Sequence, residues 1–263
     1  MAFNAPDWLI PDWPVLTGVQ AVCSTRQGGV SAAPYNSLNL GDHVGDEAAH
    51  VAANRALFQR GLGVPPVFLN QVHGTDVVHL NTNTPHGLVA DAAVTNQPGV
   101  ACTIMVADCL PVLLANRSGT LVAAAHAGWR GLAGQGGLGI LEATYQRLSA
   151  LAQSAVALSA TEMQAWLGPC IGPQAFEVGD EVREVFVAHD ALARQMFQRD
   201  GDKWLADLAG LARQRLNAMG ITRVYGNDSS APWCTVGNPS RFFSHRRDRI
   251  SGRMAVAIWR TGA

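Results

Sequence analysis

The sequence contains few cysteines, and their arrangement excludes a disulfide-rich extracellular domain. Only 5 of its 263 residues are cysteines, an odd number, and no two of them form a CxxC pair. Thiols scattered in this way are typical of a reduced chain, in which each is a core residue or a reactive one. We therefore expect a cytoplasmic protein without a disulfide framework. The five positions are Cys23, Cys102, Cys109, Cys170 and Cys234.

Long apolar segments and an excess of charge of either sign are also missing. No run approaches the roughly eighteen apolar residues that span a bilayer, and residues 1–15 carry neither a basic segment nor a long apolar one. This predicts no signal peptide and no membrane partner. The formal net charge is −1, so the basic surface that nucleic acids require is not expected either.

Short apolar runs separated by helical patterns and turn residues make up the rest of the sequence. They predict strands at 19–24, 91–95, 100–106, 112–115, 120–125, 164–167, 223–225 and 252–259. Interleaved strands and helices indicate an α/β or α+β protein. Since no linker or short repeat divides the chain, we expect a single domain over residues 1–263.

Several further elements are predicted from periodicity and turn residues. Residues 67–73 and 76–80 flank Gly74 in the pattern of a β-hairpin. A helix is expected from Glu47 to Arg60, capped by Asp46 and stopped by Gly61. The other helices are predicted over 132–151, 177–188 and 203–219.

Three side chains that bind metals well follow predicted strands. His73, Cys109 and His126 each stand where a strand ends, beside Gly, Asp or Pro, and a catalytic zinc takes three such ligands and keeps one open position. Their separations match no local zinc signature, so spacing alone leaves two interpretations open: a shared metal, or unrelated core residues. Asp108 is a candidate partner for an imidazole, and Gln71 should point to the same face of its strand as His73.

Four motifs in order carry a resemblance to a known family. They are Asn70-Gln71-Val72-His73-Gly74, Ala107-Asp108-Cys109-Leu110-Pro111-Val112, His126-Ala127-Gly128-Trp129-Arg130-Gly131 and Gly168-Pro169-Cys170-Ile171-Gly172-Pro173. With the segments at 24–31 and 242–248, they closely resemble the YfiH family, also called the laccase-domain family and formerly the multicopper polyphenol oxidases. The resemblance extends from about residue 20 to residue 259.

The resemblance implies a fold, a metal and an activity. The implied fold is α+β, with two mixed sheets packed face to face between helices in α/β/β/α layers. The implied metal is zinc held by His73, Cys109 and His126. The implied activity is phosphorolysis of adenosine, inosine, guanosine and methylthioadenosine, together with adenosine deamination. Bacterial members are also linked to editing of UDP-linked peptidoglycan precursors.

Further residue roles follow from the implied chemistry. Asp108 and Gln71 join the three ligands as expected catalytic residues, because proton transfer needs an acid or base. Phosphate calls for guanidinium groups, which bind it bidentately. Trp129 or Phe176 could stack on a purine, although either could equally be a core residue. The expected substrate-binding residues are Arg26, Arg130, Cys170 and Arg246, with Arg247 as an alternative to Arg246.

Three other functions stay open at this point. Two histidines and one cysteine also suit copper, but a laccase needs further histidines in His-x-His pairs, and none of the 8 histidines forms such a pair. Alternatively, Cys109 could be the nucleophile of an amide hydrolase with His126 as its base, which would fit peptidoglycan editing. The third possibility is a module that binds a metal or a nucleoside without catalysis.

Overall fold

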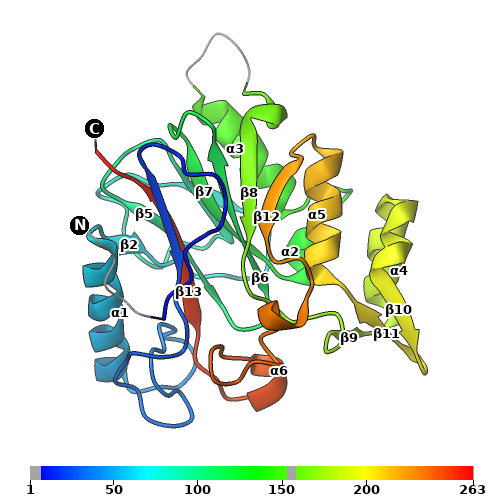
Figure 1. The fold of residues 1–263 in the computed structure, drawn as a ribbon, viewed down its shortest axis with the longest axis horizontal. Coiled ribbons are helices and arrows are strands. Elements are labelled where there is room, and N and C mark those ends of the chain that lie inside the picture. Colours follow the sequence, from blue (N-terminus) through cyan, green and yellow to red (C-terminus); the bar gives the residue numbers. More distant parts are fainter. Residues whose placement is uncertain (1–6, 153–157, 263) are drawn as a thin grey trace.

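The strands of the protein form three sheets (Figure 1) in a computed structural model that describes residues 7–152 and 158–262. Residues 1–6, part of the segment expected to lack signal-peptide features, lie outside this description. Within the described ranges, no helix is long and apolar enough to cross a membrane.

The first sheet pairs the first strand of the described chain with the last. Its four strands run in the order β1 (Val19–Cys23), β13 (Met254–Arg260), β5 (Ala101–Val106) and β2 (Pro66–Val67). The pairs β1–β13 and β13–β5 are antiparallel, whereas β2 runs parallel to β5. The sheet is therefore mixed.

The second sheet has six strands and is also mixed. The order is β12 (Arg223–Gly226), β8 (Met163–Leu167), β6 (Leu110–Asn116), β7 (Val122–Ala127), β4 (Ala92–Thr95) and β3 (Val77–His79). Every residue of the central strands β6 and β7 is buried. Such strands are apolar along their whole length, which is why continuous apolar runs predicted them.

The prediction of a β-hairpin around Gly74 is wrong. Strand β2 ends at Val67 and pairs with β5 in the first sheet, while β3 begins at Val77 and runs parallel to β4 in the second. The segment between them is therefore a crossing from one sheet to the other. Pairing between distant segments overrides the local turn signal that Gly74 gives.

The two large sheets pack face to face and share one core. Ile104 and Val256 of the first sheet lie in the same buried cluster as Leu113 and Trp166 of the second. The outer face of the first sheet packs against α1 (Ala48–Leu62) through a cluster of its own. The outer face of the second is covered by α3 (Ile140–Leu151) and α5 (Leu208–Ala218). The mixed α/β character is therefore as predicted, with helices on the outer face of each large sheet.

A third sheet, which was not predicted, lies beside α4. It is antiparallel, in the order β10 (Phe197–Asp200), β11 (Lys203–Ala206) and β9 (Glu177–Val178). The helices expected over 177–188 and 203–219 are therefore shorter, each with a strand before it. Helix α4 spans Asp180–His189, and α5 starts after Asp207, whose carboxylate accepts a hydrogen bond from the Gly210 amide.

Two other predicted helices have different ends. The helix predicted over 132–151 is two helices, α2 (Trp129–Ala133), which starts earlier than predicted, and α3. Glycines with positive φ, including Gly134 at 64°, separate them. Helix α1 runs past Gly61 and ends at Gly63, whose φ of 72° suits the left-handed C-cap. Asp46 does not cap it, because Glu47 is the N-cap residue and its side chain makes no capping bond. Short helical segments complete the described chain: η1 (Ala160–Glu162), η2 (Ala191–Met196), η3 (Ala231–Trp233) and α6 (His245–Asp248).

Candidate metal centre and its pocket

The chain crosses between the two large sheets where the predicted metal ligands lie. His73 stands on the crossing from β2 to β3, and Cys109 on the crossing from β5 to β6. His126 is the penultimate residue of β7, inside the strand rather than beyond it. The three residues thus converge at one edge of the seam between the sheets.

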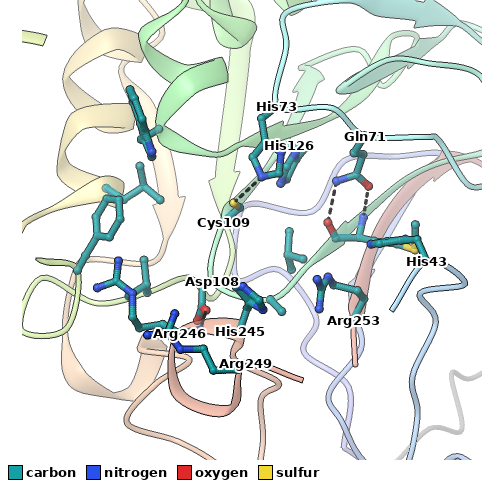
Figure 2. A pocket seen from close by; sticks show the side chains of 17 residues that line it. His43, Gln71, His73, Asp108, Cys109, His126, His245, Arg246, Arg249 and Arg253 are labelled. Atoms are coloured by element: carbon teal, nitrogen blue, oxygen red, sulfur yellow. Dashed lines mark hydrogen bonds between the residues drawn. The ribbon is translucent and has the colours of Figure 1, made fainter. Parts of the chain in front are cut away.

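His73, Cys109 and His126 form a compact group, as predicted. One donor atom from each lies within 4.8 Å of the other two, and Cys109 Sγ is 3.6 Å from His73 Nε2. The two imidazole rings meet edge to face with their centroids 4.8 Å apart (Figure 2). Within residues 7–152 and 158–262, this is the one group of three or more His, Cys, Asp or Glu side chains arranged to hold a metal.

A buried carboxylate, Asp91, holds two of these residues in place. Its Oδ1 lies 2.8 Å from His126 Nδ1 and accepts the His73 amide at 2.9 Å. Its Oδ2 accepts the amides of Gly74 at 2.7 Å and Val72 at 3.1 Å. Burial raises the pKa of Asp91, but these hydrogen bonds outweigh it and hold that pKa below its ordinary range. Asp91 is therefore an anion that accepts the Nδ1 proton of His126, which leaves Nε2 free to face the cluster.

Gly128 makes the close approach of the three side chains possible. A Cβ atom at this position would meet His73 Cδ2 at 2.8 Å and Cys109 Sγ at 3.0 Å. Three residues further on, a Cβ at Gly131 would meet the Gly74 carbonyl oxygen at 2.8 Å. The glycines of the His126–Gly131 motif thus serve to pack α2 against the histidine loop.

The cysteine and the buried histidine favour opposite charges. Burial would raise the pKa of Cys109, but the positive charge and hydrogen bonds of His126 and His73 lower it to about 6. Burial would likewise lower the pKa of His126, whereas the Cys109 thiolate and Asp91 raise it. Without a metal, the pair is therefore a thiolate beside an imidazolium, and the thiolate is the form that binds metals.

The chemistry of this donor set fits a metal ion. Two imidazoles and a thiolate from three separate segments are the ligands that a three-coordinate protein site offers to zinc, with a fourth position for water or substrate. The same set is compatible with copper. His73, Cys109 and His126 could therefore bind a metal. Their geometry does not identify which metal.

A cavity of about 450 Å³ opens beside the three residues. Figure 2 shows the side chains that line it. They include an apolar set, here called the apolar wall, and a basic set, here called the basic wall. The apolar wall consists of Trp129, Ile171, Phe176 and Leu208, and the basic wall of His43, His245, Arg246, Arg249 and Arg253.

Two expected catalytic residues line the cavity with their polar atoms already engaged. Gln71 donates to the Met105 carbonyl at 2.8 Å and accepts the Met105 amide at 2.7 Å. Asp108 accepts the Thr235 hydroxyl and the Arg246 amide, both at 2.6 Å. Neither histidine of the cluster bonds to Asp108, so the partner predicted for the imidazole is Asp91 instead.

Three of the four expected substrate-binding residues do not line the cavity. Arg26 donates to the carbonyls of Asn36 and Pro239, both at 2.9 Å. The Arg130 guanidinium stacks on the Trp129 ring, 4.5 Å from its centroid. Cys170 is buried beneath the cavity wall, 2 % exposed.

The fourth, Arg246, does line the cavity. Its terminal nitrogens donate to the Ala175 and Glu177 carbonyls, both at 3.2 Å. The alternative, Arg247, donates instead to the backbone carbonyls of Thr235, Val236 and Phe242. Arg247 therefore holds a loop together rather than facing the cavity.

The sequence reasoning missed several residues of this site. Asp91 is the first residue of a predicted strand, and no local pattern distinguishes it from other acids before strands. Arg249, Arg253 and His245 belong to a basic stretch after Phe243, and only the tertiary fold brings them to the cavity that the metal ligands line.

Comparison with known proteins gives consistent results over nearly the whole chain. The chain is 51% identical over 253 residues to the purine nucleoside phosphorylase YfiH of Escherichia coli, covering 95% of this chain and 98% of that protein. It is 48% identical over 254 residues to a purine nucleoside phosphorylase of Pseudomonas aeruginosa, covering 96% and 98%.

Solved structures agree with the sequence comparisons. A Neisseria meningitidis protein of the family called DUF152 is 44% identical and superposes with a TM-score of 0.86, covering 97% of this chain and all of that one. The Bacillus licheniformis protein YfiH is 28% identical with a TM-score of 0.87, covering 99% and 98%. The family described as multi-copper polyphenol oxidoreductase laccase matches residues 20–261. The chain therefore belongs to this family, the YfiH or laccase-domain family.

Proposed function

We propose that the protein is a zinc-dependent purine nucleoside phosphorylase. The observation that carries the proposal is one cavity that is lined by the His73, Cys109 and His126 group, by apolar side chains and by basic side chains. A purine nucleoside and phosphate need such a combination. Relatives about half identical to this chain are named as purine nucleoside phosphorylases.

Phosphorolysis exchanges one bond at the ribose for another. A phosphate oxygen forms a bond to C1′, the C1′–N9 bond breaks, and its electron pair leaves with the purine, which gains a proton. The apolar wall excludes water from the base, and Trp129 and Phe176 offer aromatic faces for stacking. A zinc ion bound by His73, Cys109 and His126 would supply Lewis-acid polarisation of an oxygen or a more acidic water.

The substrates proposed are adenosine, inosine, guanosine and methylthioadenosine. Adenosine deamination is proposed as a second activity of the same cavity, in which water adds at C6 of the purine and ammonia leaves. The engaged carboxylate of Asp108 and the doubly bonded amide of Gln71 favour positioning roles over proton transfer for these two residues.

Zinc is proposed in preference to copper because a laccase needs more ligands. A multicopper oxidase requires several further histidines, whereas the described residues hold a single potential ligand group. The thioether of Met105, a potential axial ligand, lies 3.9 Å from an Arg55 nitrogen and belongs to a buried cluster. Elemental analysis of the purified protein and an assay of phenol oxidation distinguish the metals. Copper-dependent oxidase activity would contradict the proposal.

An amide hydrolase is the second candidate, favoured by the lowered pKa of Cys109 beside His126. A thiolate paired with an imidazolium is the resting state of a cysteine nucleophile, and UDP-linked peptidoglycan precursors are its proposed substrates. It predicts turnover that resists chelators and a covalent adduct on Cys109. Tight ligand binding without turnover would instead indicate a non-enzymatic binding module.

The deciding experiment is product analysis with the zinc-loaded, full-length protein. Adenosine with phosphate should give adenine and ribose 1-phosphate, detected by mass spectrometry, together with inosine from deamination. His73→Ala, Cys109→Ala and His126→Ala should each remove bound zinc and phosphorolysis. His79→Ala, which changes a histidine outside the cavity, is the control. Phosphorolysis that survives the loss of zinc would refute the shared site.

Location and domain organisation belong to the same proposal. The five cysteines are free thiols, which supports a reducing compartment such as the cytoplasm. The buried cluster shared by the two large sheets supports one folding domain over the chain.

A further inference from the structure

The basic wall of the cavity carries more positive charge than its neighbouring carboxylates offset, since Asp42 lies 3.6 Å from His43 and Asp108 acts on Arg253. Asp108 is the one acidic side chain among the described residues that line the cavity, and both of its oxygens already accept hydrogen bonds. The three arginines Arg246, Arg249 and Arg253 outnumber this single carboxylate, and an anion bound between arginines reduces their mutual repulsion. The wall therefore has the charge of a site for an anion.

Arg249 is the most available member of this wall. Among the ion pairs and hydrogen bonds of the described residues, none involves its guanidinium, although it lines the cavity. The neighbouring carboxylate of Asp248 is bound to Arg247 at 2.7 Å and 2.8 Å, so it does not compete. Arg249 also has a φ of 62°, in the left-handed region that arginine rarely adopts. Such strain tends to persist at functional positions.

Arg253 and His245 line the same cavity as Arg249. One terminal nitrogen of Arg253 donates to the Ser251 carbonyl at 2.9 Å and the Gly252 carbonyl at 3.1 Å. This anchors the side chain while its other nitrogens make no bond within the described chain. In Figure 2, His245 and Arg249 lie below His73 and His126, and Arg253 lies to their right.

We propose that Arg249, Arg253 and His245 bind a tetrahedral oxyanion opposite the metal ligands. The role of this anion as a reactant rests on the proposed function. Two guanidinium groups and an imidazole N–H offer convergent donors of the kind that phosphate oxygens accept. Arg246 is not among them, because its nitrogens hold the 175–177 segment. Arg26 and Arg130, which the sequence suggested, lie outside the cavity.

The oxyanion can come from two sources that share this chemistry. It can be free inorganic phosphate, which attacks C1′, or the phosphoryl group of a phosphorylated substrate. In the first case, phosphate binds to the enzyme already holding adenosine. In the second, adenosine 5′-monophosphate binds at least tenfold more tightly than adenosine, and Arg249→Gln removes that advantage.

Calorimetric titration of the zinc-loaded, full-length protein with inorganic phosphate tests the site. Arg249→Gln and Arg253→Gln should each weaken phosphate binding about tenfold or more, which corresponds to about 1.4 kcal/mol. Adenosine binding should change less than twofold. Arg249→Lys should recover part of the loss, since it restores charge without the planar fork. Arg147→Gln, on the exposed surface of α3, is the matched control and should leave phosphate binding unchanged.

The outcomes separate this site from the proposed activity. Phosphate or phosphoryl binding that is lost in both arginine variants supports the site, even if no ribose 1-phosphate forms. Binding of both anions within twofold of wild type in the Arg249→Gln/Arg253→Gln double variant, with its melting temperature retained, refutes the site. Phosphorolysis with unchanged phosphate dependence in that variant would refute the site while leaving the activity standing.

Discussion

Asp91 shows how one side chain fixes the positions of several others. Its two oxygens accept four N–H groups, three from the backbone around His73 and one from the His126 ring. The carboxylate therefore sets both the direction of one imidazole and the conformation of the loop that carries the other. The hydrogen bonds of Asp91 join segments that are distant in the sequence, so no local sequence pattern predicts them.

Substituting Asp91 by Asn should weaken the metal site more than the fold. The amide has one acceptor oxygen, and its NH₂ group would oppose N–H donors of the His73 loop or the His126 ring. Loss of such a partner costs about 10–100-fold in metal affinity. We expect a loss of that size in competition titration with a zinc chelator. Asp76→Asn, an exposed acid on the same crossing, is the control, and equal zinc affinity in the two variants would contradict the role assigned to Asp91.

The lowered pKa of Cys109 predicts an unusual pH profile for the metal-free protein. Because this pKa is about 6, the thiolate should predominate above pH 6, whereas an ordinary thiol ionises near 8.5. Alkylation of Cys109 by iodoacetamide should therefore rise up to about pH 7 and then level off. Mass spectrometry of the Cys109 peptide measures it.

Zinc provides the control for this measurement, because bound metal should protect the thiolate at every pH. A rate that continues to rise through pH 8 would show that His126 and His73 do not stabilise the thiolate.

At the scale of elements, the turn from β7 into α2 determines how closely the ligands approach. Gly128→Ala places a methyl group within 3.0 Å of atoms of His73 and Cys109, so both side chains must shift. We expect zinc affinity to fall at least tenfold while the protein remains folded, measured by zinc titration alongside circular dichroism. Gly237→Ala is the matched control, because its nearest contact is an ordinary 3.8 Å. Unchanged affinity in Gly128→Ala would contradict the steric argument.

Strands that are buried along most of their length could be predicted from sequence, and so could the partly exposed β12, whereas the short strands of the third sheet could not. Strands such as β5 and β7 consist mostly of apolar residues, and the structure contains them within two residues of the predicted bounds. Strand β11 is a short Lys-Trp-Leu-Ala segment that precedes a helix, and it resembles the first turn of that helix. Strands β2 and β3 were expected to pair with each other because their true partners, β5 and β4, come later in the chain.

At the scale of the whole molecule, the core between the sheets should make unfolding a single event. Leu113 of β6 is fully buried between the sheets. Leu113→Ala should reduce the free energy of unfolding by about 2–5 kcal/mol. Hydrogen exchange should then accelerate in both β8 and β13, which belong to different sheets. Leu192→Ala, 60 % exposed, is the control.

Two separate unfolding transitions, or loss of protection in one sheet alone, would show that the chain is not one domain.

The site could be predicted in part because its ligands are of distinctive types. His73, Cys109 and His126 stand out by residue type and motif, and the structure brings them together. Residue type did not identify the arginines of the cavity. Guanidinium groups also bind backbone carbonyls and stack on rings, as Arg26 and Arg130 do. Only the fold determines which arginines face a cavity.

The crossings that carry His73 and Cys109 have a mechanical consequence. Each belongs to a connection between the two large sheets, so the distance between their donor atoms reports how one sheet sits on the other. Sliding of one sheet over the other would increase the distance between these atoms. An ion bound to both would oppose that movement. Metal affinity and the resistance of the two sheets to relative movement then both depend on how firmly the sheets are held against each other. Substitutions far away in the shared core should be detectable at the metal.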